Sequence, residues 1–383
     1  MTDSPGRPTV AAGTADRDPP HPRPNLYGAT LRDLERIVEL DSLPRYRARQ
    51  VAEWLYRHHA PDIDAMTNLP APTRADWNDR YRIATVDHRH AGTSGDGTQK
   101  HVWDAFGGDV YETALIPEAN RLTLCVSSQA GCRIGCKFCL TARKGLKQSL
   151  SAAEILSQYR NLPDRDRVTH IVFMGMGEPL DNADAVIDAV TVLTSDWGYG
   201  LSPRRITVST VGILPELERL LDRTDVNVAV SLHAARREER LPIVPSENRY
   251  PIADIAELLR NRARLGLPPF AATGRRRLSF EITMLDGITD QPAQAAAVRD
   301  LIAGIPSRVN LIPWNPFPGT QFRPSERGAI EAYQAILKRA GITTTIRESR
   351  GQDIGAACGL LAGRRDSTTA DAAASATASS TSA

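Results

Sequence analysis

Four of the five cysteines in this 383-residue chain lie close together, at Cys125, Cys132, Cys136 and Cys139. Three of them follow the spacing Cys132-x-x-x-Cys136-x-x-Cys139. Glycines between them let a short loop fold tightly, and the two basic residues inside the loop favour thiolate over thiol. The pattern therefore predicts a loop that wraps a metal centre.

Two kinds of metal centre fit this loop. In a structural zinc site Cys125 would be the fourth thiolate ligand, because such zinc is four-coordinate. In a 4Fe-4S site Cys132, Cys136 and Cys139 would hold the cluster and leave one iron open, whereas electron carriers use four cysteines. Zinc sites commonly join a Cys-x-x-Cys pair to a second, distant pair of ligands, which this loop lacks. The spacing favours iron–sulfur and leaves zinc open.

Composition is that of an ordinary globular enzyme. Charged residues make up 24% of the chain, hydrophobic residues 41%, and the formal net charge is +2. No apolar run reaches the length of a membrane span, and the N-terminus lacks the pattern of a signal peptide. Five cysteines gathered mostly in one place do not form a secreted disulfide framework. We expect a cytoplasmic protein with no membrane partner.

The chain divides by composition into a core region between two tails. Residues 1–24 are proline-rich and residues 365–383 are Ala/Ser/Thr-rich, so both are predicted to be disordered. Residues 25–88 show helical spacing of apolar positions, with Thr30 as a candidate cap of the first helix. Arginines and aromatic residues punctuate these helices. A solvated helix surface would explain them, but beside a catalytic domain acting on RNA they predict an RNA-binding domain.

Residues 89–120 change to short alternating segments broken by glycines, which predicts a small β extension with strands at 101–104 and 110–116. From 121 to 364, strand-like and helix-like runs alternate, which predicts an α/β fold with a parallel sheet and outer helices. Either a barrel or a doubly wound sheet satisfies this pattern, and both gather ligands at the C-terminal strand ends. The predicted strands are 122–126, 169–174, 206–209, 226–232, 279–285, 309–312 and 343–347. The predicted helices are 152–161, 183–194, 213–222, 251–265, 291–303 and 326–340.

Polar residues stand where four of these strands end. Glu178 follows the strand at 169–174, Ser209 ends the next strand, Ser231 and His233 follow the strand at 226–232, and Asn315 lies in a proline-framed loop. Each has an ordinary structural explanation, such as a turn residue or a satisfied core histidine. Their occurrence at successive strand ends after a cysteine loop predicts an active site.

The fifth cysteine, Cys358, lies in Arg350-Gly-Gln-Asp-Ile-Gly-Ala-Ala-Cys-Gly359. Small neighbours on both sides predict an accessible thiol on a mobile loop, although a buried inert cysteine is equally compatible with the local sequence. Cys125, which lies outside the three-cysteine spacing, is its natural partner if two thiols share a site.

At these residues the chain resembles a known family. The three-cysteine spacing, with Phe138 before the last cysteine, resembles the signature of radical S-adenosylmethionine (SAM) enzymes. The fuller set resembles the RlmN/Cfr family of RNA adenine methyltransferases, in order and over residues 30–363. Its motifs are Tyr111-Glu-Thr, Cys125-Val-Ser-Ser-Gln-x-Gly-Cys, Met174-Gly-Met-Gly-Glu-Pro, Ser231-Leu-His, Pro313-Trp-Asn-Pro-Phe-Pro-Gly and Arg350-Gly-x-Asp-Ile-x-Ala-Ala-Cys-Gly.

The resemblance implies a fold, cofactors and residue roles. The fold would be a radical SAM partial (β/α)6 barrel with a small N-terminal helical domain and a β extension. Cys132, Cys136 and Cys139 would ligate a 4Fe-4S cluster, and two SAM molecules would be used per turnover. SAM would be held by Gly177, Glu178, Ser209, Ser231, Leu232, His233 and Asn315.

The resemblance also implies a reaction. One SAM would methylate Cys358, and a radical formed from a second SAM would abstract hydrogen from that methyl group. The resulting carbon radical would add to an adenine ring in 23S rRNA or tRNA. Glu112 would accept a proton, and Cys125 would form a transient disulfide with Cys358 to release the product. An external one-electron reductant of flavodoxin or ferredoxin type would be needed, and the enzyme would be a monomer.

Several alternatives stay open at this point. The helical N-terminal domain and the Trp-Asn-Pro-Phe-Pro stretch favour methylation at carbon 2, the RlmN branch, over carbon 8, the Cfr branch. Val244-Pro-Ser-Glu-Asn248 departs from the family pattern of Val-Pro, an apolar residue and Asn. A radical SAM maturase acting on protein, or a zinc-stabilised RNA-binding protein, would be different classes. The basic residues Arg143, Lys144 and Lys147 and the arginine run at 275–277 are candidates for phosphate contact, although a solvated charged edge explains the arginine run better.

Overall fold

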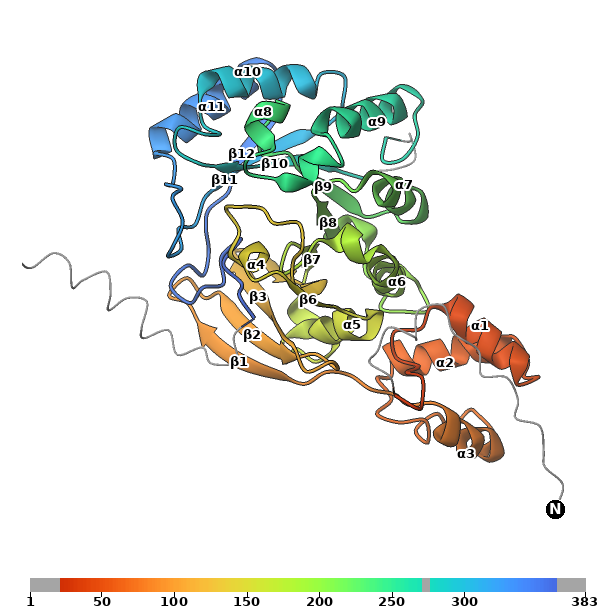
Figure 1. Ribbon diagram of the computed structural model, residues 1–383. Coiled ribbons are helices and arrows are strands. Elements are labelled where there is room, and N and C mark those ends of the chain that lie inside the picture. The colour runs from red at the N-terminus through yellow and green to blue at the C-terminus, as the bar shows by residue number, and fades with distance from the viewer. Residues whose placement is uncertain (1–20, 271–275, 364–383) are drawn as a thin grey trace, which may run out of the picture.

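The computed structural model describes residues 21–270 and 276–363 (Figure 1). Residues 1–20 of the predicted N-terminal tail and all of the predicted C-terminal tail at 365–383 lie outside the described residues. Arg275 of the arginine run also lies outside them.

One ten-stranded sheet runs through the molecule, and its strands follow chain order from edge to edge. From β4 onward every neighbouring pair is parallel. A doubly wound sheet would reverse its strand order part-way, so sequential order identifies a barrel-like winding. The predicted partial (β/α)6 barrel is confirmed: six strand–helix units are followed by a seventh parallel strand, β12. Its parallel strands are β4 (Arg121–Cys125), β7 (His170–Phe173), β8 (Ile206–Thr210), β9 (Asn227–Ser231), β10 (Leu278–Met284), β11 (Arg308–Pro313) and β12 (Thr343–Ile346).

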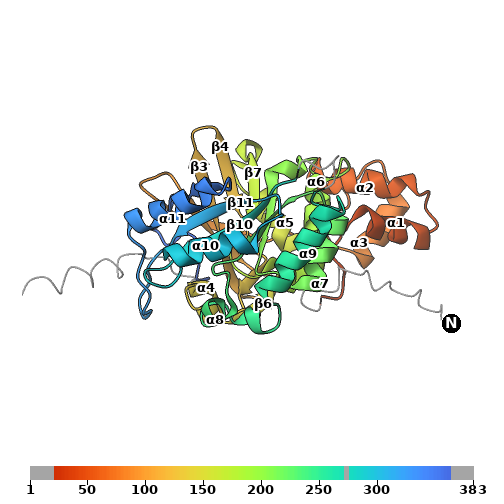
Figure 2. The ribbon, with the colours of Figure 1, turned by 90° about the horizontal axis from the view of Figure 1, so that it is seen from above.

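Each step between consecutive parallel strands contains one long helix, and the helices lie outside the curved sheet (Figure 2). Their bounds match the predicted helices to within two residues. Two shorter helices, α4 (Leu140–Arg143) and α8 (Arg237–Arg240), were not predicted. The long helices are α5 (Ala152–Arg160), α6 (Ala183–Thr194), α7 (Leu214–Arg223), α9 (Ile252–Arg264), α10 (Pro292–Leu301) and α11 (Arg327–Arg339).

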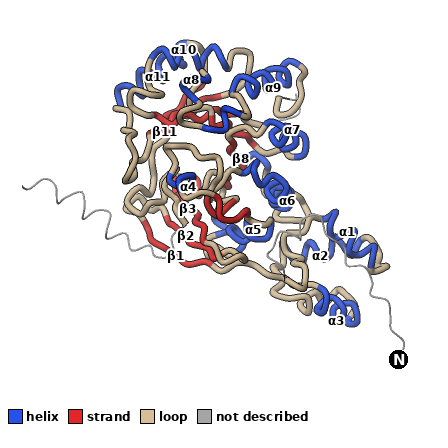
Figure 3. The backbone as a smooth tube through the Cα atoms, viewed as in Figure 1, coloured by secondary structure: helices blue, strands red, loops and turns tan. Residues whose placement is uncertain are grey.

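The β extension continues the same sheet rather than forming a separate one (Figure 3). β1 (His88–Thr93), β2 (Gln99–Asp104) and β3 (Val110–Glu118) are antiparallel to one another, and β3 is antiparallel to β4. The glycine pair at 107–108 forms the predicted turn between β2 and β3. A two-stranded sheet of β5 (Gln129–Gly131) and β6 (Leu146–Ser149), which brackets the cysteine loop, was not predicted.

Three helices make up the N-terminal unit: α1 (Leu31–Leu40), α2 (Tyr46–Tyr56) and α3 (Ala71–Arg80). Thr30 caps α1 as predicted: its side chain accepts a hydrogen bond from the backbone N–H of Asp33, whose side chain bonds back to the cap. Each helix contributes a fully buried side chain to the core: Leu34 from α1, Val51 from α2 and Trp77 from α3.

The N-terminal unit docks on the barrel through two of the arginines predicted to face RNA. Arg49 pairs with Asp196 at 2.9 Å, and the guanidinium of Arg57 donates to the carbonyls of Asp196 and Gly198. Tyr27 and Tyr199 share a hydrogen bond of 2.8 Å across the same junction. Arg49 and Arg57 thus hold the N-terminal unit against the barrel, and other side chains of the unit would have to form an RNA-binding surface.

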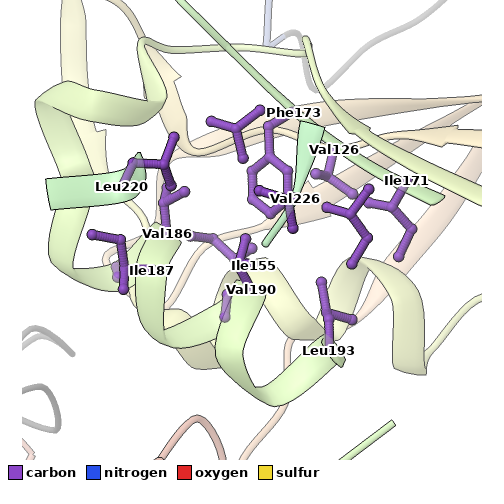
Figure 4. Close-up of a cluster of buried hydrophobic side chains, with 14 of the residues drawn as sticks. Val126, Ile155, Ile171, Phe173, Val186, Ile187, Val190, Leu193, Leu220 and Val226 are labelled. Carbon is purple, nitrogen blue, oxygen red and sulfur yellow. The ribbon is translucent and has the colours of Figure 1, made fainter. Parts of the chain in front are cut away.

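The main core lies between the sheet and α5, α6 and α7 (Figure 4). Phe173 and Ile171 of β7 face Val190 of α6, and Leu220 of α7 closes the cluster. Ile171 and Phe173 are the fully buried positions of β7 and alternate with half-buried ones, so one face of this strand packs on α6. Within the described residues no helix is long and apolar enough to cross a membrane.

Truncation of Leu220 tests this core. Leu220 is 0% exposed, so Leu220→Ala should lower the free energy of unfolding by about 2–5 kcal/mol through lost burial and the cavity left behind. Leu265→Ala is the matched control, because Leu265 is 66% exposed and its truncation should change stability by less than about 0.5 kcal/mol. Urea denaturation of both variants measures the difference, and equal midpoints would contradict this packing.

Candidate active site

The cysteine loop, residues 132–139, is closed at its base by the β5–β6 pair. Cys132 N donates to the Gly145 carbonyl at 3.1 Å, and Lys137 N donates to the Ile243 carbonyl at 3.0 Å. Gly131 has φ +83°, and a Cβ there would stand 1.9 Å from the Gly145 oxygen, so only glycine fits. The loop is therefore held at both ends by backbone bonds.

The three loop thiols lie in one buried environment. Burial raises the pKa of all three thiols, that of Cys132 to about 12. The nearby thiols of Cys139 and Cys132 raise the pKa of Cys136 further. Hydrogen bonds from backbone N–H groups to two of the sulfurs act in the opposite direction and lower the pKa. The N–H of Ile134 donates to Cys132, and those of Thr141 and Ala142 donate to Cys139. Hydrogen bonds to sulfur of this kind tune iron–sulfur sites.

The thiol arrangement fits a cluster better than a single ion. Among the described residues no group of three or more His, Cys, Asp or Glu side chains is arranged to hold one metal ion. In a 4Fe-4S cluster each thiolate binds a different iron, so the thiols need not converge on a single point. Cys125 is near Cys358 and not near this loop, so it does not supply the fourth ligand that zinc would need.

Glu178 lies buried at the end of β7, as predicted. Its carboxylate accepts hydrogen bonds from Thr210 Oγ1 at 2.6 Å and from the backbone N–H groups of Val211 and Leu180, each at 3.0 Å. Burial raises the pKa of Glu178 to about 7, against these hydrogen bonds, which lower it. Gly177, the residue before it, has φ +99°, and a Cβ added there would stand only 2.6 Å from the Cβ of Gln129.

The side chain of Gln129 holds the turn at residues 177–181 through two hydrogen bonds. Its Oε1 accepts from Glu178 N at 3.0 Å, and its Nε2 donates to Asp181 Oδ2 at 2.8 Å. Asp181 also pairs with Arg133 of the cysteine loop at 2.8 Å. A chain of polar contacts thus links the cysteine loop to the Glu178 turn.

Ser209, Ser231 and Leu232 lie at the predicted strand ends, with the two serines half-buried and Leu232 fully buried. The carbonyls of Ser231 and Leu232 both accept from the guanidinium of Arg240, each at 2.9 Å. Arg240 is 0% exposed and pairs with Glu247 at 2.6 Å. The buried pair fixes the strand ends from behind, and it places Glu247, part of the departure at 246–248, in a structural role.

His233 adopts the left-handed conformation, with φ +58°, which is uncommon outside glycine. Its ring lies 4.7 Å from that of Phe138 in the cysteine loop, and its Nδ1 accepts from Thr283 N at 3.2 Å. Burial, and secondarily Arg240, lowers the pKa of His233 to about 3, so the ring is neutral. The strained backbone turns this histidine toward the cysteine loop.

Asn315 lies between the cysteine loop and the Cys358 segment. Its Nδ2 donates to the Cys358 carbonyl at 3.1 Å, and its Oδ1 accepts from Gln352 Nε2 at 2.6 Å. Beside it, Trp314 Nε1 donates to the Phe138 carbonyl at 2.9 Å. The loop after β11 therefore joins both cysteine-bearing segments.

The segment carrying Cys358 returns from β12 to the β extension on the opposite edge of the sheet (Figure 1). Gly351 N donates to Asp96 Oδ2 at 2.9 Å, and Ser94 Oγ donates to Asp353 Oδ1 at 2.5 Å. Past the cysteine, Leu140 N donates to the Gly359 carbonyl at 2.8 Å. The segment is thus tied both to the β1–β2 turn and to the cysteine loop.

Cys125 lies close to the segment that carries Cys358. Ile354 and Ala356 of the Cys358 segment pack with Cys125 and Ala114 in one apolar cluster. Burial and then the Cys358 thiol raise the pKa of Cys125. Cys358 is exposed by surface area, yet desolvation by the surrounding chain still raises the pKa of its thiol. All five cysteines lie within the described residues and all are free, so the structure contains no Cys125–Cys358 disulfide.

Glu112 of β3 faces the Cys358 segment, and its side chain is buried, with 1% exposure. Its Oε2 accepts from Ala362 N at 2.9 Å, and its backbone carbonyl accepts from Ser127 Oγ at 2.5 Å. Lys100 of β2 lies 4.0 Å from its Oε1. A carboxylate, the Cys125 thiol and an ammonium group therefore lie against the Cys358 segment.

Two of the predicted phosphate contacts have other partners. Arg143 donates to the Gly319 carbonyl at 2.7 Å and lies over the Phe317 ring, which fixes the loop after β11. Arg276 is almost buried and bonds Asp225 and the Leu221 carbonyl. Charged runs in a sequence do not reveal such internal partners. Lys144 and Lys147 are exposed.

Comparison with known proteins agrees with this geometry. A dual-specificity RNA methyltransferase RlmN of Marinobacter nauticus is 41% identical over 89% of this chain and 93% of its own length. A probable RlmN of Parabacteroides distasonis is 39% identical over 88% of this chain and 96% of its own length.

The chain belongs to the RlmN family.

Family models agree on its parts. Residues 24–83 match the N-terminal domain of ribosomal RNA large subunit methyltransferases, and residues 126–297 match the radical SAM superfamily. A radical SAM methyltransferase from Sphaerobacter thermophilus superimposes with a TM-score of 0.78 at 39% identity, covering 89% of this chain and 99% of that one. Membership in the RlmN family implies a 4Fe-4S cluster and SAM, and the three-thiol loop fits the cluster.

Some residues that build this RlmN-family site were not predicted. Ser127 and Gln129 lie inside a motif that the sequence displayed, so a signal was present. Arg240 and Glu247 lie in charged stretches that are typical of solvated helix surfaces, and only folding shows them buried. Lys100 had no signal beyond its place in a strand.

The raised pKa of Glu178 makes a pH prediction. Between pH 4.5 and about 7 the folded apoprotein holds a proton on Glu178 that the unfolded chain has lost. The contribution of Glu178 to stability therefore falls as pH rises through this window. Glu178→Gln should remove that slope, measured as the free energy of unfolding at several pH values relative to wild type. Glu257→Gln, at an exposed position of α9, should leave it unchanged, and an unchanged slope in Glu178→Gln would contradict the assignment.

Proposed function

We propose that this protein is a radical SAM methyltransferase that methylates carbon 2 of an adenosine in 23S rRNA and in tRNA through a methylated Cys358. The observation that carries the proposal is the convergence at Cys358. One segment contacts Glu112 through Ala362 N, packs against Cys125, and bonds the cysteine loop through Gly359. The relatives' shared name, dual-specificity RNA methyltransferase RlmN, supports the RNA substrate and the carbon-2 branch.

The cofactors have distinct places in this proposal. Cys132, Cys136 and Cys139 would hold the cluster, and SAM would lie against the residues at the strand ends. The cluster and SAM supply the methyl group of Cys358 and the radical chemistry that makes this methyl group reactive. The proposed SAM contacts are Gly177, Glu178, Ser209, Ser231, Leu232, His233 and Asn315.

Three side chains of the chain itself would then act on the bound adenine. Cys358 carries the methyl carbon to the ring. Glu112 takes the proton that carbon 2 gives up, and its buried, doubly anchored position fixes the carboxylate for that task. Radical addition leaves an unpaired electron on the ring, which would pass to the one-electron carrier as Glu112 takes the proton. Cys125 would then attack the Cys358 sulfur: the sulfur–carbon bond breaks, its electron pair goes to the methylene carbon, and that carbon takes up a proton to become the methyl group. The transient Cys125–Cys358 disulfide formed in this step would be reduced by an external thiol before the next turnover.

The chemistry explains why such an apparatus is needed. Carbon 2 of adenine lies between two nitrogens and is not nucleophilic, so it cannot attack SAM directly. The base must also leave its stack to reach Cys358, which suits a single strand or a loop of RNA. We further propose that the enzyme works as a monomer in the cytoplasm, with an external flavodoxin- or ferredoxin-like reductant.

Mass spectrometry of the purified protein tests the proposal. Protein made with sufficient iron and SAM should carry one methyl group on Cys358 and should convert adenosine in a target RNA into carbon-2-methyladenosine. A zinc-loaded, colourless protein with unmodified Cys358 would overturn the proposal. Product methylated at carbon 8 instead would assign the other branch of the family.

Removal of Cys125 should stop the reaction at a covalent intermediate. In Cys125→Ala the bond between the Cys358 methylene and the RNA base cannot be resolved, so a protein–RNA adduct should accumulate and withstand denaturing electrophoresis. Val172→Ala, which trims a side chain beside Cys125 without removing a thiol, should turn over normally. Cys358→Ala should form no adduct. Normal turnover in Cys125→Ala would refute its proposed role.

A further inference from the structure

Lys100 is a buried lysine that the proposed mechanism does not use. It is 7% exposed, although lysine is almost never buried without a partner. Its ammonium lies 4.0 Å from Glu112 Oε1, which is an ion-pair distance but too long for a hydrogen bond. Within the part of the chain that the structure describes, Lys100 Nζ donates no hydrogen bond, so its N–H groups are available to a ligand.

The register of the sheet places Lys100 among the catalytic groups. Lys100 pairs with Ala114 on β3, and Ala114 pairs with Cys125 on β4. Glu112 stands two residues before Ala114, so its side chain lies on the same face of the sheet. Lys100, Glu112 and Cys125 therefore share one face, and the Cys358 segment packs against that face.

The ammonium also lies beside the Cys358 segment itself. A Cβ added to Gly355 would stand 3.7 Å from Lys100 Nζ. Gly355 precedes Cys358 by three residues, and Ala362, which binds Glu112, follows it by four. Lys100 and Glu112 thus lie on either side of the base of the segment that would carry the methyl group.

We propose that Lys100 is a further catalytic residue, whose ammonium donates a hydrogen bond to a ring nitrogen beside carbon 2 of the target adenine. This inference rests on the proposed function. Glu112 must reach the hydrogen on carbon 2 to act as the base. Lys100 Nζ lies 4.0 Å from Glu112 Oε1, so it would lie near the atoms bonded to carbon 2. The atoms bonded to carbon 2 are nitrogens 1 and 3, and both are hydrogen-bond acceptors in adenine.

The chemistry gives this contact a purpose. Addition of a carbon group at carbon 2 moves electron density onto the adjacent nitrogens. A fixed ammonium group aimed at such a nitrogen stabilises that charge more strongly than it stabilises the unreacted base. If the contact is to nitrogen 1, it also distinguishes adenine from guanine, whose nitrogen 1 carries a hydrogen atom.

A binding experiment tests the contact apart from turnover. The probes are RNA hairpins with adenosine at the target position, or analogues in which carbon replaces nitrogen 1 or nitrogen 3. With the full-length enzyme and no SAM, one of the two analogues should bind roughly tenfold more weakly than adenosine, as expected for loss of a charged hydrogen bond. Lys100→Met should bind adenosine more weakly and should no longer distinguish that analogue.

Activity measurements complete the test. Lys100→Met should lose methylation of RNA by roughly a hundredfold, as when one charge-stabilising donor is removed, while methylation of Cys358 stays at the wild-type level. Lys338→Met removes the same charge from the exposed face of α11 and should behave as wild type in every assay.

The outcomes separate the two proposals. A wild type that methylates neither Cys358 nor RNA overturns the proposed function. A wild type that is active but binds both analogues as tightly as adenosine overturns the role of Lys100, even if Lys100→Met does not fold. An active Lys100→Met that still distinguishes the analogue shows Lys100 to be only the ion-pair partner of Glu112, and overturns the inference as well.

Discussion

Closure of the open barrel by the chain's own C-terminal segment is the constraint on which the site depends. The sheet begins at β1 and ends at β12, and no strand pairs these two edges within the described residues. Residues 347–363 span the interval through hydrogen bonds to the β1–β2 turn, to Asn315, to the cysteine loop and to Glu112. Because this segment has no regular structure, its position is set by these contacts. The position of the Cys358 thiol is thus set by backbone contacts to both edges of the sheet and to the cysteine loop.

Charge is buried around this closure in a way that is expensive unless each group has a partner. Arg240 is enclosed by Glu247 and by strand-end carbonyls, so its charge is balanced within the protein. Glu178 is enclosed by three N–H and O–H donors. Lys100 and Glu112 are paired at a greater distance and face the Cys358 segment. The first two groups hold the framework in place, and the third pair lies against the segment that carries Cys358.

Much of the fold could be predicted because its strands are short runs that are apolar or alternate apolar and polar residues, as in Ile206–Thr210, and its helices follow regular spacing. The boundaries of β8, α6 and α9 came close to the observed ones for this reason. The cysteine loop, Glu178 and the Cys358 motif could be singled out because unusual residue types recur at strand ends. What could not be predicted depends on tertiary partners. Which element packs on which is not contained in the local sequence. The burial of Arg240 and Lys100 and the contact between Arg49 and the barrel therefore could not be predicted.

The hydrogen bond between Gly351 and Asp96 joins residues 255 positions apart. Its two partners leave the ribosome at very different times, since synthesis proceeds from the N-terminus at a limited rate. The β extension can form early and the barrel can wind strand by strand, but the loop that positions Cys358 can close only after residues 351–363 have been made. A chain that stops before residue 351 would contain the three-thiol loop without the thiol proposed to receive the methyl group. The contacts that position Cys358 thus form only after the rest of the barrel has been synthesised.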